Sequence, residues 1–60
     1  MRSRKSIEEE LKSIGYQSYS YIGLDDYTIN KIGEKLDEIA KNEYIGRDEI
    51  DRVILPYLND

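Results

Sequence analysis

Apolar residues recur at helical spacing in three separate stretches of this 60-residue chain. Positions three and four residues apart lie on one face of an α-helix, so each stretch presents an apolar stripe to a core. The stripes consist of Ile7, Leu11 and Ile14; of Ile29, Ile32, Leu36, Ile39 and Ala40; and of Ile50, Val53, Ile54, Tyr57 and Leu58. The pattern predicts helices over residues 6–14, 26–42 and 48–58.

A repeated phrase marks where two of these helices begin. Tyr21-Ile22-Gly23-Leu24-Asp25-Asp26 returns as Tyr44-Ile45-Gly46-Arg47-Asp48-Glu49. Each copy combines a hydrophobic anchor, a glycine and an acidic residue suited to accept hydrogen bonds from free N–H groups at a helix start. We therefore expect Asp25 and Asp48 to be N-caps.

Other residues mark the remaining helix ends. Ser6 and Glu9 have the spacing of a capping box, so Ser6 is the expected N-cap of the first helix. Gly15 is the expected stop of that helix, and Pro56 predicts a kink or an end near Leu55.

The expected fold is a compact all-α domain of three helices over residues 6–60, preceded by a flexible basic arm at residues 1–5. Residues 16–23 have no helical period and are rich in Tyr and Ser, which favours an ordered, extended connection. A very short β-bridge from this connection to Tyr44–Ile45 is compatible with the sequence. Gly33 lies within the second stripe, either as a notch for a close neighbour or as a tolerated loss of helix propensity.

Composition excludes several function classes. The chain has no Cys and no His, which removes thiolate chemistry and the commonest general base and metal ligand. A calcium loop ending at Glu49 would need a ligand at Ala40, which has no oxygen in its side chain. We therefore expect neither an enzyme nor a metal or cofactor. No apolar run approaches a membrane span or a signal peptide, so a soluble, cytoplasmic protein is expected.

One segment resembles a known family. Ile39-Ala40, Ile45-Gly46 and then Ile50 and Val53 lie where the helix-turn-helix of bacterial repressors and winged-helix proteins has its packing residues. The resemblance covers residues 36–54 and implies a corner between the second and third helices, with the third entering DNA. Where the family usually has an apolar residue and then glycine in the turn, this chain has Glu43 and Tyr44.

Charge favours a protein partner over DNA. The net charge is −4, and Asp48, Glu49 and Asp51 would face the phosphates in a helix-turn-helix complex. Our leading hypothesis is a non-catalytic regulator or inhibitor that binds a protein with a basic patch. Its expected binding residues are Tyr16, Tyr19, Tyr27 and Leu55, because tyrosines suit binding surfaces and Leu55 lies off its stripe. The other interpretation of the tyrosines is that Tyr16 or Tyr21 fills a small core while the others lie at its edge.

The alternative is a DNA-binding regulator, expected to be a dimer. The expected DNA contacts are Arg47 and Arg52 in the groove and the arm residues Arg2, Arg4 and Lys5 beside it. A third hypothesis is a purely structural role through self-association, since a chain this short buries a thin core.

Overall fold

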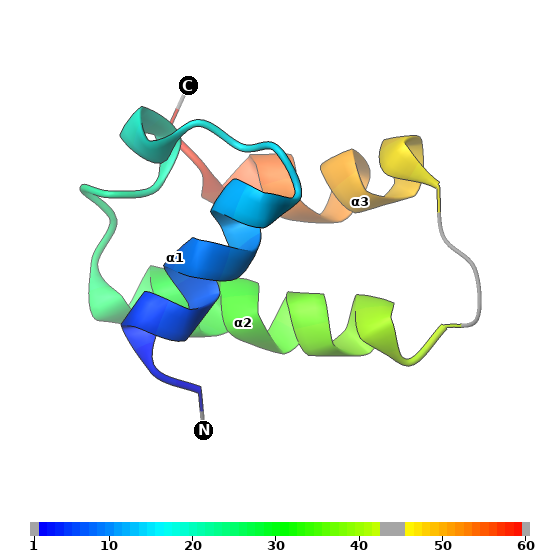
Figure 1. Ribbon diagram of the computed structural model, residues 1–60, viewed down its shortest axis with the longest axis horizontal. Helices are drawn as coiled ribbons and strands as arrows, with labels where there is room; N and C mark the ends of the chain where they lie inside the picture. Colours follow the sequence, from blue (N-terminus) through cyan, green and yellow to red (C-terminus); the bar gives the residue numbers. More distant parts are fainter. Residues whose placement is uncertain (1, 43–45, 60) are drawn as a thin grey trace.

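The chain folds as a small all-α domain. A computed structural model describes residues 2–42 and 46–59. Over these residues it has three α-helices, α1 (Arg4–Ser13), α2 (Asp26–Ala40) and α3 (Arg47–Ile54), and two short 3₁₀ helices, η1 (Ser18–Ser20) and η2 (Leu55–Tyr57) (Figure 1). The predicted all-α class with three helices is confirmed.

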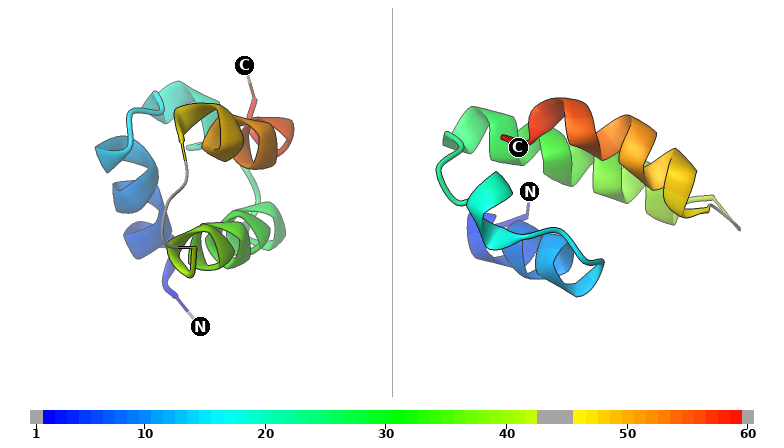
Figure 2. Two further views of the ribbon diagram at one scale, coloured as in Figure 1. Left: turned by 90° about the vertical axis from the view of Figure 1, so that its right-hand side faces the viewer. Right: turned by 90° about the horizontal axis from the view of Figure 1, so that it is seen from above.

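α2 and α3 form a hairpin against which α1 packs. The two helices run side by side in opposite directions, and α1 lies at an angle against one side of the pair (Figures 1 and 2). In a DNA-binding helix-turn-helix the helices instead meet at about 90–120°. The predicted turn residues Tyr44 and Ile45 lie outside the described part of the chain, so the family resemblance stays a prediction.

The first helix begins two residues earlier than predicted. Ser3, rather than Ser6, is the N-cap, because its hydroxyl oxygen accepts a hydrogen bond of 3.1 Å from the Ser6 N–H. Arg4 and Lys5 therefore belong to α1 and not to an arm. Arg4 supports this start through an ion pair of 2.9 Å with Glu8, one turn further along.

Gly15 ends α1 as predicted. Its φ of +103° is left-handed, a conformation that favours glycine. The Tyr16 N–H donates to the Leu11 carbonyl at 3.0 Å, and the Gly15 N–H donates to the Lys12 carbonyl at the same distance. This pair of bonds is a Schellman motif, and it is accompanied by burial of both Leu11 and Tyr16.

α2 begins as predicted and ends two residues early, at Ala40. The Asp25 carboxylate accepts a hydrogen bond of 2.9 Å from the Thr28 N–H. The hydrogen bonds from Thr28 hold the pKa of this carboxyl below its usual value. Ala40 is exposed, so it is not the close-packing residue that the stripe and the family resemblance predicted.

Gly33 is a notch for α1. A Cβ built on Gly33 would lie 2.7 Å from Cδ1 and 3.1 Å from Cγ1 of Ile7, which is inside normal contact distance. The missing side chain therefore lets α1 pack closely on α2. Of the two interpretations of this glycine, close approach is the one that the structure supports.

α3 begins at Arg47, and its N-cap is Gly46, two positions before the predicted cap Asp48. Asp48 and Glu49 instead occupy the first turn, where carboxylates interact favourably with the helix dipole. The α-helix ends at Ile54, and Pro56 lies in η2, as its missing donor predicts.

The core lies between the three helices and the connection after α1. Its buried apolar residues come from the three α-helices, from the connection after α1 and from the residue that follows η2. They are Ile7, Leu11, Tyr16, Tyr21, Ile29, Ile32, Leu36, Ile54 and Leu58. Tyr16 and Tyr21 both contribute, so the connection after α1 is anchored at two points. Of the described residues, 16–23 form η1 and turns rather than a strand.

Candidate binding surface

A shallow hollow of about 160 Å³ opens between the segment that follows α1 and the end of the chain. We call it the Tyr19–Leu55 hollow. It is lined by Gly15, Tyr16, Gln17, Tyr19, Ser20, Leu55 and Leu58. None of these side chains carries a formal charge at pH 7, although 37% of the chain's residues are charged.

Three of the four residues predicted to bind a partner meet at this hollow. Tyr19 is 72% exposed and Leu55 is 43% exposed, although both are large and apolar. Tyr16 is buried and forms part of the wall. The fold thus brings together residues from the connection after α1 and from η2, which the sequence suggested only individually.

Local hydrogen bonds shape the hollow. In η1 the Ser20 N–H and hydroxyl both donate to the Gln17 carbonyl, at 3.0 Å and 2.6 Å. The Asn59 N–H donates to the Ser20 carbonyl at 2.8 Å, which ties the chain after η2 to η1. The left-handed Gly15 turns the chain from α1 into this segment. These contacts hold both sides of the hollow in place.

A polar cluster that the sequence did not reveal supports the wall. The Tyr16 hydroxyl donates to Asp51 Oδ1 at 2.6 Å, and Asp51 pairs with Arg47 Nε at 3.2 Å. The Arg47 guanidinium carbon lies 4.7 Å from the centre of the Tyr16 ring, and the same group donates to the Ile14 carbonyl. Arg47 therefore joins the start of α3 to the end of α1.

The cluster changes the acidity of Tyr16. Burial, followed by the hydrogen bond to Asp51 and the Asp51 charge, raises the pKa of Tyr16 to about 12, against a partial opposing effect of Arg47. No sequence motif signals these contacts, because Tyr16 and Asp51 are 35 positions apart.

The fourth predicted binding residue, Tyr27, lies elsewhere. It stands on the first turn of α2, is 70% exposed, and is not among the residues that line the Tyr19–Leu55 hollow. The Lys31 ammonium lies 5.5 Å from the centre of its ring. Tyr27 is therefore an exposed tyrosine outside the Tyr19–Leu55 hollow, and its ring lies next to a charged side chain.

The arginines predicted to contact DNA are paired with acids in this chain. Arg2 pairs with Glu10 and Asp37, which joins residue 2 to α1 and α2. Arg4 pairs with Glu8 and, at 2.8 Å, with Asp26. Both guanidinium groups are therefore already paired with carboxylates in the protein without DNA.

The remaining basic candidates differ in their surroundings. Arg52 lies 3.3 Å from Glu49 on the exposed side of α3, and Arg47 belongs to the cluster with Tyr16 and Asp51. Lys5 is exposed on α1.

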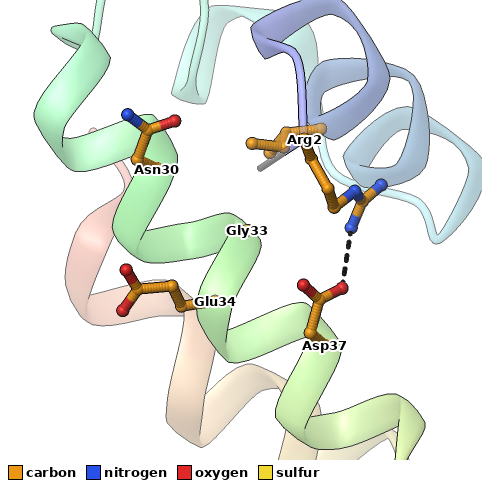
Figure 3. Close-up of a pocket in the computed structure, with 6 residues that line it drawn as sticks. Arg2, Asn30, Gly33, Glu34 and Asp37 are labelled. Atoms are coloured by element: carbon orange, nitrogen blue, oxygen red, sulfur yellow. Dashed lines mark hydrogen bonds and ion pairs between the residues drawn. The ribbon is translucent and has the colours of Figure 1, made fainter.

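A second hollow, of about 210 Å³, lies beside the Gly33 notch and is lined by Arg2, Ile7, Asn30, Gly33, Glu34 and Asp37. Arg2 and Asp37 point toward one another and close one side of it, whereas Glu34 points away (Figure 3). Within its lining, an ion pair of 3.5 Å joins Arg2 and Asp37. Its lining includes the charged groups of Arg2, Glu34 and Asp37, whereas the residues that line the Tyr19–Leu55 hollow carry no formal charge.

Over residues 2–42 and 46–59, no three Asp or Glu side chains are grouped so that they could hold a metal ion. No helix in the same described ranges is long and apolar enough to cross a membrane. In comparisons with protein-family models, with curated proteins and with solved structures, nothing matches this chain.

Proposed function

We propose that this protein is a small, non-catalytic regulator or inhibitor that acts by binding another protein. The observation that carries the proposal is the exposure of Tyr19 and Leu55 at the rim of one uncharged hollow. Large apolar side chains gathered around a concavity are typical of the centre of a protein interface, where tyrosine is enriched and charged residues are depleted.

The physical advantage of this surface is a low desolvation cost. A partner side chain that enters the hollow displaces water without stripping it from a charged group. The tyrosine ring supplies contact area and keeps a hydroxyl for a hydrogen bond at its edge. Tyr19 and Leu55 are therefore the expected energetic centre of the contact.

The charge of the chain indicates the kind of partner. With a net charge of −4, the protein attracts a basic surface over a distance, which speeds encounter more than it adds affinity. We therefore propose a partner with a basic patch around an apolar side chain that enters the hollow.

DNA binding, the alternative, receives less support from the geometry. Arg2, Arg4 and Arg47 each lie beside a carboxylate of the same chain, so phosphate contacts would have to compete with existing ion pairs. α2 and α3 also run antiparallel instead of crossing. Fluorescence anisotropy with duplex DNA tests this alternative, and the absence of binding at low salt would eliminate it.

The test of protein binding is capture from an extract of the native host by the immobilised protein. Tyr19→Ala and Leu55→Ala are expected to reduce capture of the same partner about tenfold or more, because interface centres depend on such anchors. Tyr27→Ala is the matched comparison, since it removes an equally exposed tyrosine away from the hollow. Unchanged capture by both hollow variants would refute this surface.

A further inference from the structure

One arginine lies behind the Tyr19–Leu55 hollow and contacts two of the residues that line it. The guanidinium carbon of Arg47 lies 4.7 Å from the centre of the Tyr16 ring. A Cβ placed on Gly15 would lie 3.4 Å from Nη1 of Arg47, so the guanidinium group packs directly against this glycine. The same group donates to the carbonyl of Ile14, the C-cap of α1, where a cation is favoured by the helix dipole. Arg47 thus interacts with three consecutive residues, where α1 ends and the hollow begins.

The opposite side of the hollow is attached to the helix that carries this arginine. α3 runs from Arg47 to Ile54, and Leu55, which lines the hollow, follows immediately. Because α3 is one continuous helix, holding Arg47 at one end and burying Ile54 at the other determines where Leu55 lies. Asp51 supports the first end, because it accepts from the Tyr16 hydroxyl at 2.6 Å and pairs with Arg47 Nε at 3.2 Å.

α3 depends on tertiary contacts to stay in place. It is eight residues long, and a helix this short is not stable by itself in water. Its N-cap, Gly46, provides no side-chain hydrogen bond, and among its own residues only Ile54 is buried. α2, in contrast, has the Asp25 cap and four buried residues. The start of α3 therefore relies on the contacts that Arg47 makes.

We propose that Arg47 is a positioning residue for the Tyr19–Leu55 hollow. Its contacts with Ile14, Tyr16 and Asp51, which we call the Arg47 clasp, hold α3 against the end of α1 and keep the two sides of the hollow together. When the clasp opens, α3 and Leu55 separate from η1 and the hollow is lost, while α1 and α2 stay packed. This opening is a local equilibrium, distinct from unfolding of the whole domain.

The clasp adds a means of regulation to the proposed function, on which this part of the inference rests. A partner that enters the hollow contacts both of its sides, so it binds the closed form and stabilises it. A change that opens the clasp lowers the apparent affinity in proportion to the closed fraction that is lost. Arg47 therefore affects partner binding without contacting the partner.

Two backbone amides report the two kinds of opening. The Asn59 N–H donates to the Ser20 carbonyl at 2.8 Å and joins the chain after η2 to η1, so its hydrogen exchange measures separation of the two sides of the hollow. Leu36 is buried within α2, so exchange of its N–H measures unfolding of the α1–α2 pair.

Hydrogen exchange of the whole protein, followed by NMR where the rate reflects the opening equilibrium, tests the proposal. Arg47→Ala is expected to speed exchange of the Asn59 N–H about tenfold or more, because a hydrogen bond to a charged group contributes about that factor. Arg47→Lys keeps the charge but not the planar fork, so it is expected to restore only part of the protection. Arg52→Ala is the matched control on the same helix. Arg52 pairs with Glu49 within α3, so its loss is expected to leave Asn59 unchanged.

A substitution outside the clasp separates positioning from general stability. Ile7→Val weakens the contact of α1 with α2 at the Gly33 notch. It is expected to speed exchange of the Leu36 N–H and to leave the Asn59 N–H unchanged, because α1 and α2 stay packed when the clasp opens. Arg47→Ala speeds both, since it destabilises the closed form relative to every open one.

Three outcomes would overturn the proposal. They are unchanged Asn59 exchange in Arg47→Ala, equal acceleration by Arg52→Ala, and acceleration of Asn59 and Leu36 to the same degree by Ile7→Val. The last would mean that the hollow opens only when the whole domain unfolds. Circular dichroism verifies that each variant is folded, and if Arg47→Ala is not, Arg47→Lys compared with Arg52→Lys gives the same test. No partner is present, so a failure here leaves the protein-binding function standing, and a failed capture experiment leaves the clasp standing.

Discussion

Replacing Gly33 by alanine tests the close packing of α1 on α2. The new methyl group would lie 2.7 Å from Cδ1 and 3.1 Å from Cγ1 of Ile7, whereas carbon atoms in contact are normally about 3.5–4.0 Å apart. Ile7 is only 1% exposed, so its side chain cannot turn into solvent to make room. Either Ile7 leaves its preferred conformation or α1 moves away from α2.

Two opposing effects determine how much Gly33→Ala changes the free energy of unfolding. Overpacking a core by one methyl group costs about 1–3 kcal/mol. Alanine in place of glycine inside a helix returns about 1 kcal/mol through helix propensity. We expect Gly33→Ala to lower the free energy of unfolding by about 1 kcal/mol, which for a domain of this size lowers Tm by about 4–8 °C.

The assay is chemical denaturation of the two single variants and the double variant. Ile7→Val removes the Cδ1 atom of the shortest contact and costs about 1 kcal/mol by itself. With Val at position 7, Gly33→Ala is expected to become neutral or stabilising, a coupling of about 1 kcal/mol. Glu34→Ala compared with Glu34→Gly, at the exposed neighbouring position, measures the propensity difference separately, because both variants lose the Lys31–Glu34 ion pair.

One result would refute the reasoning. If Gly33→Ala stabilised the protein by the full propensity difference and showed no coupling to Ile7→Val, the notch would have no packing role.

Three further predictions concern helix caps and pH. Ser3→Ala should lower the free energy of unfolding by about 1 kcal/mol and Ser6→Ala by much less; equal losses in urea titrations would contradict Ser3 as the cap of α1. Asp25→Ala should cost about 1 kcal/mol, whereas Asp25→Asn keeps an acceptor for the Thr28 N–H and should stay close to wild type by the same assay. Tyr16 has a pKa of about 12 in the fold against 10.0 without it, so its stabilising contribution is complete below pH 10 and is lost as pH rises to 12. Tyr16→Phe should remove that loss and the phenolate absorbance step near pH 12, and a Tyr16 step at pH 10 would contradict the buried hydrogen bond to Asp51.

Features that depend on neighbouring residues could be predicted from the sequence. The Gly15 stop, the Asp25 cap and the end of the α-helix before Pro56 follow from φ preferences, side-chain acceptors and a missing donor within one helical turn. The predictions failed where two local signals compete. Both Ser3 and Ser6 are residue types that can cap α1, and in the structure Ser3 is the N-cap.

The candidate surface could be predicted only in part. Exposure of Leu55 follows from its position off the apolar stripe, and the sequence singled out Tyr19 as a tyrosine in a connection without helical period. The sequence suggested Tyr16, Tyr19 and Tyr27 as binding residues and left open whether Tyr16 fills the core instead. In the structure Tyr16 is buried, Tyr19 lies exposed at the Tyr19–Leu55 hollow and Tyr27 lies exposed at the start of α2.

The sequence by itself determined that three helices form and which face of each is apolar, because both properties depend on contacts within a few residues. Only the tertiary structure decided that α2 and α3 run antiparallel, that Arg47 reaches the Tyr16 ring and that Tyr19 meets Leu55. The last two of these contacts join residues 31 and 36 positions apart. They depend on the angles at which helices pack, and side-chain shapes such as the Gly33 notch between α1 and α2 set those angles. The apolar stripe marks the position of Gly33 but does not identify Ile7 as the neighbour that packs there.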